Sequence, residues 1–165
     1  VYKELDGGII LSNDGTVYVE QPEQEPDVDQ IRTAKLAEVS SRCESAIFAG
    51  VDVELTDGSV EHISLKEKDQ INLFGKQSQL AAGATQLEYH EDGKLCKYYS
   101  AEDMTKIIEA AMKFVSYHTT YCNSMNAWIK GAQTAEEIEA IQYGAQIPDK
   151  YKSKVLKDYE AAMGA

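Results

Sequence analysis

The sequence predicts an α+β fold in which one long central helix is packed by shorter helices and by two or three β-hairpins. Apolar residues recur from Met104 to Ile129 at alternating spacings of four and three, with no proline or glycine between them. This period is typical of a long amphipathic helix. Asp-Gly pairs follow short apolar stretches at Asp14, Asp57 and Asp92. Each pair predicts a hairpin turn, because glycine adopts positive φ without penalty.

The first 27 residues are predicted to lie outside the main domain. In residues 1–20, Ile9–Leu11 and Val17–Val19 flank the turn sequence Ser12–Gly15, so we expect an N-terminal hairpin. Residues 21–27 contain two prolines among polar and acidic residues, which is typical of a linker. The predicted organisation is therefore a hairpin appendage, an acidic linker, and an α+β domain over residues 28–165.

Within that domain, capping residues and glycines predict where each helix begins and ends. The first helix should run from about Val28 to Ala49, where Asp27 and Gln30 form a capping box and Gly50 follows. The predicted elements then alternate as a hairpin around Asp57, a helix over 65–82, a hairpin around Asp92, the long helix, a short helix ending near Ile141 and a terminal helix from about Asp149. Their predicted caps are Ser64 with Glu67, Ser100 with Asp103, and Thr134 with Glu137.

The charge and hydropathy of the chain exclude two classes of partner. The formal net charge is −12, and eight of the acids lie in residues 1–30 against the single base Lys3. An acidic surface repels phosphate backbones, so we expect no nucleic-acid partner. No apolar run approaches the roughly 20 residues of a membrane span, so we expect no membrane partner. Because the chain begins at Val1 instead of Met, we expect a processed or partial polypeptide.

The three cysteines carry no disulfide or metal motif. None forms a C-x-x-C pair, and a sparse, odd number predicts reduced thiols in a cytosol. His118 and Cys122 share a helix face, which could provide two zinc ligands or a thiol nucleophile with its base. They lie on the most apolar face of the chain, however, where both residue types are common in cores. The sequence therefore predicts no catalytic residue, no metal ligand and no cofactor.

A second apolar row widens the face of the long helix. Its members recur every seven residues: Ile107, Phe114, Tyr121 and Trp128. The resulting face is broader than the two-row seam of a simple coiled coil. Because exposed apolar patches usually mark interfaces, we expect a homo-oligomer that packs along residues 107–128.

Several short segments between Ile31 and Tyr143 resemble a family of uncharacterised domains encoded in bacteriophage and prophage tail gene clusters. These segments are Ile31–Lys35, Ser41–Ile47 with Gly50, His62–Leu65, Asp69–Leu73, Tyr89–His90, Thr119–Tyr121 with Asn123, and Ile141 with Tyr143–Gly144. The most family-like element contains Asp69, Gln70 and Asn72. Its place at a helix start predicts a structural role, in which the acid complements the helix dipole and the amides bond to the neighbouring hairpin. Binding of a partner or ligand is the alternative.

The resemblance implies a structural or host-interacting role in a phage tail or baseplate, without a catalytic site. We therefore expect a non-enzymatic structural or receptor-binding module, made in the bacterial cytoplasm and located in the virion tail. Its expected partners are other copies of itself, other tail proteins and a host surface. A tail assembly chaperone is one alternative. A small thiol-dependent hydrolase that uses Cys122 and His118 is another.

Overall fold

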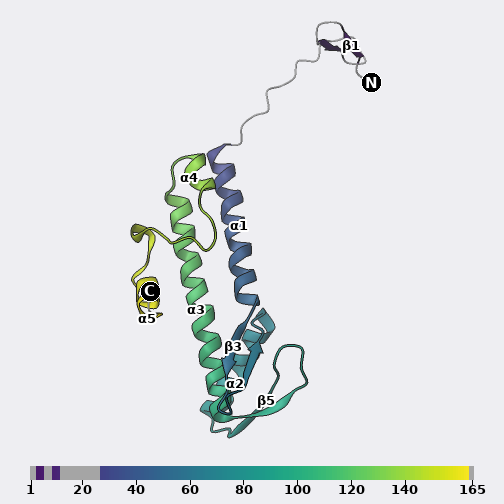
Figure 1. The fold of residues 1–165 in the computed structure, drawn as a ribbon, viewed down its shortest axis with the longest axis vertical. Helices are drawn as coiled ribbons and strands as arrows, with labels where there is room; N and C mark the ends of the chain where they lie inside the picture. The colour runs from purple at the N-terminus through teal and green to yellow at the C-terminus, as the bar shows by residue number, and fades with distance from the viewer. Residues whose placement is uncertain (1–2, 6–8, 12–26, 164–165) are drawn as a thin grey trace.

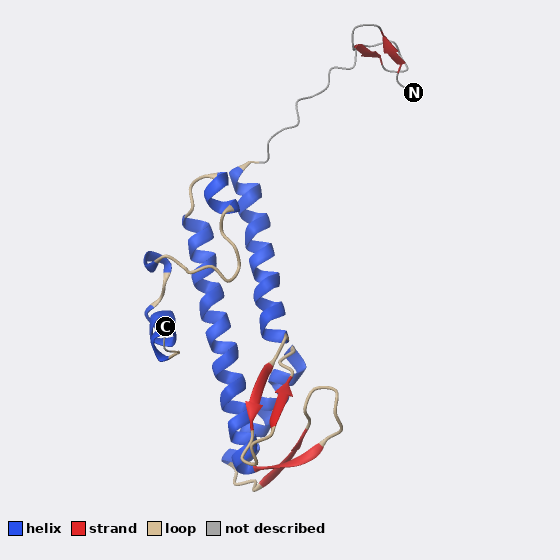
Figure 2. Cartoon of the chain, viewed as in Figure 1, coloured by secondary structure: helices blue, strands red, loops and turns tan. Residues whose placement is uncertain are grey.

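A computed structural model describes residues 3–5, 9–11 and 27–163 of the chain. Helices alternate with two-stranded antiparallel sheets, which confirms the predicted α+β fold (Figure 2). The helices are α1 (Val28–Phe48), α2 (Glu67–Ala81), α3 (Ala101–Gly131), α4 (Ala135–Glu139) and α5 (Lys154–Ala162), with a 3-10 turn η1 (Asp149–Tyr151). The strands are β1 (Lys3–Leu5), β2 (Ile9–Leu11), β3 (Val51–Glu54), β4 (Val60–Ile63), β5 (Gln86–Tyr89) and β6 (Lys97–Ser100).

Two long helices, α1 and α3, lie antiparallel and side by side (Figure 1). The 31 residues of α3 extend over about 45 Å at about 1.5 Å per residue. Near its C-terminal end, Arg32 Nη1 of α1 donates hydrogen bonds to the carbonyl oxygens of Ile129 at 2.9 Å and Ala132 at 2.8 Å. A cation at this end of a helix is favourable, because the last carbonyl groups carry the negative end of the helix dipole.

A disulfide also joins the same two helices. Cys43 of α1 and Cys122 of α3 have Cα atoms 6.2 Å apart, and both residues are buried. The prediction that these thiols are reduced is therefore wrong. The two cysteines are 79 positions apart, and helix periodicity does not reveal which helices pair. The odd cysteine is Cys96, which is free and exposed.

Both hairpins of the main domain form at the predicted Asp-Gly turns. β3 pairs with β4 around Gly58, whose φ is 84°, and β5 pairs with β6 around Gly93, whose φ is 71°. The helix α2 connects the two hairpins. Each hairpin packs on the first half of α3, so this end of the long helix is covered by strands and not by α1 (Figure 1).

Two of the predicted helix caps are confirmed. Ser100 Oγ accepts a hydrogen bond of 3.1 Å from the backbone N–H of Asp103 at the start of α3. Thr134 and Glu137 form a reciprocal capping box on α4. Both signals are local, which explains why the sequence was sufficient to find them.

The other predicted helix starts need correction. Asp27 is the N-cap residue of α1 but makes no side-chain cap hydrogen bond. α2 begins at Glu67 instead of Leu65, and Asp69 Oδ2 accepts from the backbone N–H of Lys66 at 3.1 Å, so Ser64 and Glu67 do not form the box.

The end of the chain also differs from the prediction. The segment from Asp149 first makes the 3-10 turn η1, and α5 begins only at Lys154. Ser153 Oγ accepts a hydrogen bond of 3.1 Å from Leu156 N–H and so caps α5. A single predicted helix is therefore replaced by two short elements.

The described residues near the N-terminus form a strand pair that was not predicted. Ile9–Leu11 pairs antiparallel with Lys3–Leu5, which the sequence analysis had not assigned to a strand. The predicted second strand, Val17–Val19, and residues 21–26 of the predicted linker lie outside the described residues.

The buried residues form two clusters along α3. The first contains the inward-facing residues of both hairpins, α2 and the first half of α3, with Ile63, Leu65, Met104 and Ile107 fully buried. The second contains residues of α1, the second half of α3, α4, the following loop and α5. α3 is therefore the one helix among the described elements that contributes to both clusters.

Candidate functional site

The family-like residues Asp69 and Gln70 join α2 to the preceding hairpin. Asp69 Oδ2 accepts a hydrogen bond of 2.8 Å from Ser64 Oγ, in addition to the one from Lys66 N–H. Gln70 Nε2 donates a hydrogen bond of 2.8 Å to the carbonyl oxygen of Leu65. Asn72 is exposed. Two of the three side chains therefore hold the start of α2 against the segment that directly follows β4.

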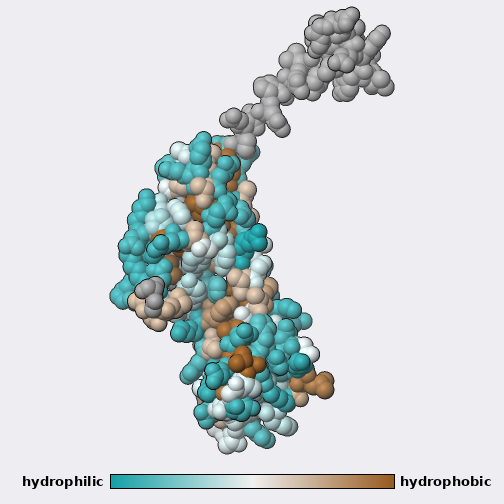
Figure 3. Space-filling model, viewed as in Figure 1, coloured by the Kyte–Doolittle hydropathy of each residue, from teal (hydrophilic) through white to brown (hydrophobic). Residues whose placement is uncertain are grey.

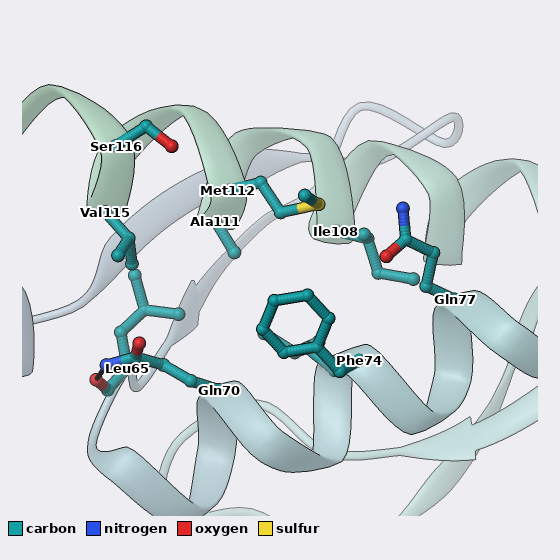
Figure 4. A pocket seen from close by; sticks show the side chains of 10 residues that line it. Leu65, Gln70, Phe74, Gln77, Ile108, Ala111, Met112, Val115 and Ser116 are labelled. Atoms are coloured by element: carbon teal, nitrogen blue, oxygen red, sulfur yellow. Dashed lines mark hydrogen bonds between the residues drawn. The ribbon is translucent and has the colours of Figure 1, made fainter.

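Gln70 also stands at one end of an apolar groove between α2 and α3. The groove encloses a cavity of about 90 Å³. α3 contributes Ile108, Ala111, Met112, Val115 and Ser116, and the other side is formed by Leu65, Gln70, Leu73, Phe74 and Gln77. Figure 4 shows the Phe74 ring between the two helices, with Met112 across from it and the two glutamines on either side.

Large apolar side chains remain exposed at this groove. Phe74 is 60% exposed and Met112 is 41% exposed, whereas Ile71, which does not line the cavity, is 68% exposed elsewhere on α2. Each exposed apolar residue forgoes the stabilisation that burial would supply. A cluster of such residues beside a cavity is the feature expected of a docking surface. Phe74, Met112 and the groove that they line are the candidate site, which we call the α2–α3 groove.

The sequence did not reveal this site, because an apolar period does not show which side of a helix its neighbours leave uncovered. Leu73 and Leu80, which are seven residues apart, define the inward side of α2. At 100° per residue, Ile71 lies about 200° from Leu73 around the helix axis. The helical period therefore contained the signal that Ile71 faces away from the core.

The row predicted as an oligomer interface packs inside the chain itself. Ile107 is fully buried in the first cluster and Tyr121 is buried in the second. The Tyr121 hydroxyl donates to the carbonyl oxygen of Ala145 at 2.8 Å. Phe114 and Trp128 are half-buried against the two clusters. Ile107 and Tyr121 are thus unavailable to a partner, because the hairpins and the loop after α4 cover that side of α3.

Cys122 and His118, the pair considered for thiol chemistry, do not form a thiol site in this structure. The Cys122 sulfur is bonded to Cys43 and is not a thiolate in this state. His118 Nδ1 lies 3.3 Å from the Tyr143 hydroxyl, and its ring packs 4.4 Å from the Phe114 ring. Burial lowers the pKa of His118, so its imidazole is neutral at pH 7. These contacts are those of a core histidine.

A buried carboxylate lies between the two hairpins. Glu61 of β4 is 6% exposed and accepts a hydrogen bond of 2.5 Å from the Tyr99 hydroxyl of β6. Lys97 forms an ion pair with the same carboxylate. Burial and the Glu61 contact raise the pKa of Tyr99, so its hydroxyl remains protonated and donates. All three groups satisfy one another, so this cluster docks β4 on β6 and leaves no free reactive group.

The described residues contain neither a metal-binding cluster nor a membrane-spanning helix. No group of three or more His, Cys, Asp or Glu side chains is placed to hold a metal ion in this part of the chain. Among the helices of residues 27–163, none combines the length and apolar character needed to cross a membrane.

Residues 30–143 match a family described as a domain of unknown function, DUF4376. The chain belongs to this family. The match agrees closely with the Ile31–Tyr143 range over which the sequence resembled an uncharacterised family. The DUF4376 region includes both main hairpins, α2, α3, α4 and nearly all of α1, and therefore the complete α2–α3 groove. No curated protein and no solved structure matches the chain.

Proposed function

We propose that this DUF4376 protein is a non-enzymatic docking module of a bacteriophage tail or baseplate, with a structural or receptor-binding role. The observation that carries the proposal is the α2–α3 groove, where Phe74 and Met112 are exposed beside a cavity. The tail assignment rests on the sequence resemblance to domains encoded in tail gene clusters. Its partners would be other tail proteins, further copies of itself or a host surface, and its location would be the virion tail.

The chemistry of the groove supports docking more than catalysis. Its walls are mainly aliphatic and aromatic, and its polar lining consists of two glutamines and a serine. None of these groups titrates near neutral pH, and acid–base or nucleophilic catalysis needs a group that can exchange a proton or be activated. Apolar walls with amide groups at the rim instead suit a protein segment, because the amides can bond to its backbone.

A tail assembly chaperone is the second candidate, and the same groove favours it. A chaperone must cover an apolar surface of a client before assembly and release it afterwards. The exposed residues Phe74 and Met112 offer such a surface. The two candidates differ in whether the protein remains in the finished particle.

The test is the composition of purified phage particles. Particles would be produced with wild-type protein, with Phe74→Asp in the groove, and with the matched control Val155→Asp on α5, which replaces an apolar residue of similar exposure. We expect mass spectrometry to find the wild-type and control proteins in the particle and to find the Phe74→Asp protein depleted. A protein absent from particles but required for tail formation would be a chaperone. Intact infectious particles without the protein would overturn both candidates.

A further inference from the structure

We propose that the α2–α3 groove of one copy of this protein receives the side chain of Leu95 from a second copy. The inference rests on the proposed docking function, because it names an occupant for the same groove. Leu95 follows the turn between β5 and β6 and is 91% exposed, more than any other large apolar residue in the described part of the chain. Figure 3 shows hydrophobic atoms standing out from the surface where this loop lies.

The loop that carries Leu95 is held in place by several contacts. The backbone N–H of Asp92 donates a hydrogen bond of 2.9 Å to the carbonyl oxygen of His62 on β4. On the other side of Leu95, Lys97 and Tyr99 both bind the buried Glu61 carboxylate. An apolar side chain on an anchored loop loses little conformational freedom when it binds. Leu95 is therefore presented as a fixed apolar projection.

The groove has the complementary features. Its walls are apolar where a leucine side chain would enter, and its rim carries Gln70 and the exposed Gln77. Glutamine amides both donate and accept hydrogen bonds, so they can satisfy the backbone groups that flank an inserted leucine. Leu95 does not line its own groove. The projection and the cavity thus belong to separate surfaces of one chain, and a contact between them needs two copies.

Charges beside the two surfaces are also complementary. Glu91, Asp92 and Lys94 lie at the hairpin turn before Leu95, while Glu109 and Lys113 flank Met112 on α3. Within residues 27–163, none of these five side chains forms an ion pair. The turn has one more acid than base, so Lys113 beside the groove can pair with an acid of the turn, and Lys94 of the turn can pair with Glu109. Opposite charges at the rim of an apolar contact favour the correct partner and orientation.

A contact between two different patches has a consequence for assembly. If the rotation between copies closes, the result is a ring or a reciprocal dimer, and otherwise the copies extend into a filament. In each case every contact uses Leu95 from one copy and the groove from another. A variant that lacks only one of the two surfaces retains the other and can still contribute to one contact.

The experiment uses sedimentation velocity on the full chain at micromolar concentration. The variants are Leu95→Asp, which removes the projection, and Phe74→Asp, which places a charge in the groove, with Val155→Asp as the control. We expect the wild-type and control proteins to associate. The dissociation constant of self-association should be at least about tenfold higher for Leu95→Asp alone and for Phe74→Asp alone, because each variant loses the burial of Leu95. An equimolar mixture of the two variants should form a heterodimer, since it restores one complete contact.

Several outcomes would overturn this inference. Wild-type protein that remains monomeric, Leu95→Asp protein that associates as wild type does, or a mixture that stays monomeric would each do so. Circular dichroism and thermal melts check that the variants fold, and Met112→Lys replaces Phe74→Asp if that variant is unfolded. Loss of this self-association would not change whether the protein is found in phage particles. A negative sedimentation result is therefore distinguishable from a negative result in the particle experiment.

Discussion

The Tyr99 hydroxyl donates a 2.5 Å hydrogen bond to the carboxylate of Glu61, 38 positions away on the other hairpin. Glu61 is buried, and its second oxygen is paired with Lys97. A buried carboxylate is costly unless it is fully paired and hydrogen-bonded. The two hairpins therefore depend on each other, because separating them would leave this charge without partners.

Removing the Tyr99 hydroxyl should destabilise the protein. We expect Tyr99→Phe to lower the free energy of unfolding by about 1–3 kcal/mol, since a hydrogen bond to a buried charge is lost while the ring remains. Urea denaturation measures the change. The control is Tyr98→Phe, because the neighbouring ring is 71% exposed and its loss of a hydroxyl should cost less than about 0.5 kcal/mol. Equal costs for both variants would mean that the Glu61 contact contributes nothing.

Reduction of the disulfide should also destabilise the protein. The Cys43–Cys122 bond closes a loop that contains both main hairpins and α2. A native disulfide typically raises the free energy of unfolding by about 2–4 kcal/mol, because it restricts the unfolded chain. We expect the double variant Cys43→Ser, Cys122→Ser to lose about this much in urea denaturation, and Cys96→Ser to lose nothing.

Thiol counting checks the same bond directly. In denaturant without reductant, alkylation should modify only Cys96, and after reduction it should modify all three cysteines. Mass spectrometry of the alkylated chain distinguishes these states. Three modified cysteines without reductant would restore the earlier expectation of reduced thiols.

The sequence predicted features that depend on neighbouring residues. The 3.6-residue period located α3, and the capping residues Ser100 and Thr134 located two helix starts. By contrast, Arg32 and the carbonyl oxygen of Ile129 are 97 positions apart, and no local pattern connects them. Periodicity reports that a helix has an apolar face but not which segment covers it.

The candidate site was missed for a related reason. The seven-residue spacing of its row assigned Ile107 to an interface with a partner, and no local pattern identified Phe74 as exposed. In the structure Ile107 is buried and Phe74 is exposed, because the hairpins cover one side of α3 and leave the side facing α2 partly open.

The stability of the protein should fall as the pH rises above neutrality. His62 Nδ1 lies 2.6 Å from Asp52 Oδ1, and its Nε2 lies 2.7 Å from the carbonyl oxygen of Ala49 at the end of α1. Both partners are acceptors, so both contacts are made only by the protonated ring. The bond to Asp52 is the main cause of a raised His62 pKa, and the bond to Ala49 and the charges of Asp52 and Asp92 also raise it.

A raised pKa defines the direction of the pH effect. The contribution of His62 is complete below its unfolded pKa of about 6.5 and is lost as the pH rises through the higher folded value. Thermal melts between pH 6 and about pH 9 should show this fall for wild type. His62→Gln should lack this component of the pH dependence. A wild-type profile identical to that of His62→Gln would show that the ring is neutral throughout.

The last prediction separates core residues of α3 from docking residues on the same helix. Phe114 packs against the first buried cluster and against the His118 ring, whereas Met112, two residues earlier, is exposed at the groove. Phe114→Ala should lower the free energy of unfolding by about 2 kcal/mol. Truncating a fully buried phenylalanine costs about 3–5 kcal/mol, and Phe114 is only half-buried. Met112→Lys should change it by less than about 0.5 kcal/mol.

The two substitutions should have the opposite order of effect on association. Met112→Lys should weaken self-association because it charges the groove, and Phe114→Ala should leave association intact below its melting temperature. Urea denaturation and sedimentation on the same samples measure both quantities. A Phe114→Ala protein that is as stable as wild type but dissociated would place the interface back on the row of Ile107, Phe114, Tyr121 and Trp128. The burial of Ile107 and Tyr121 within the chain argues against that outcome.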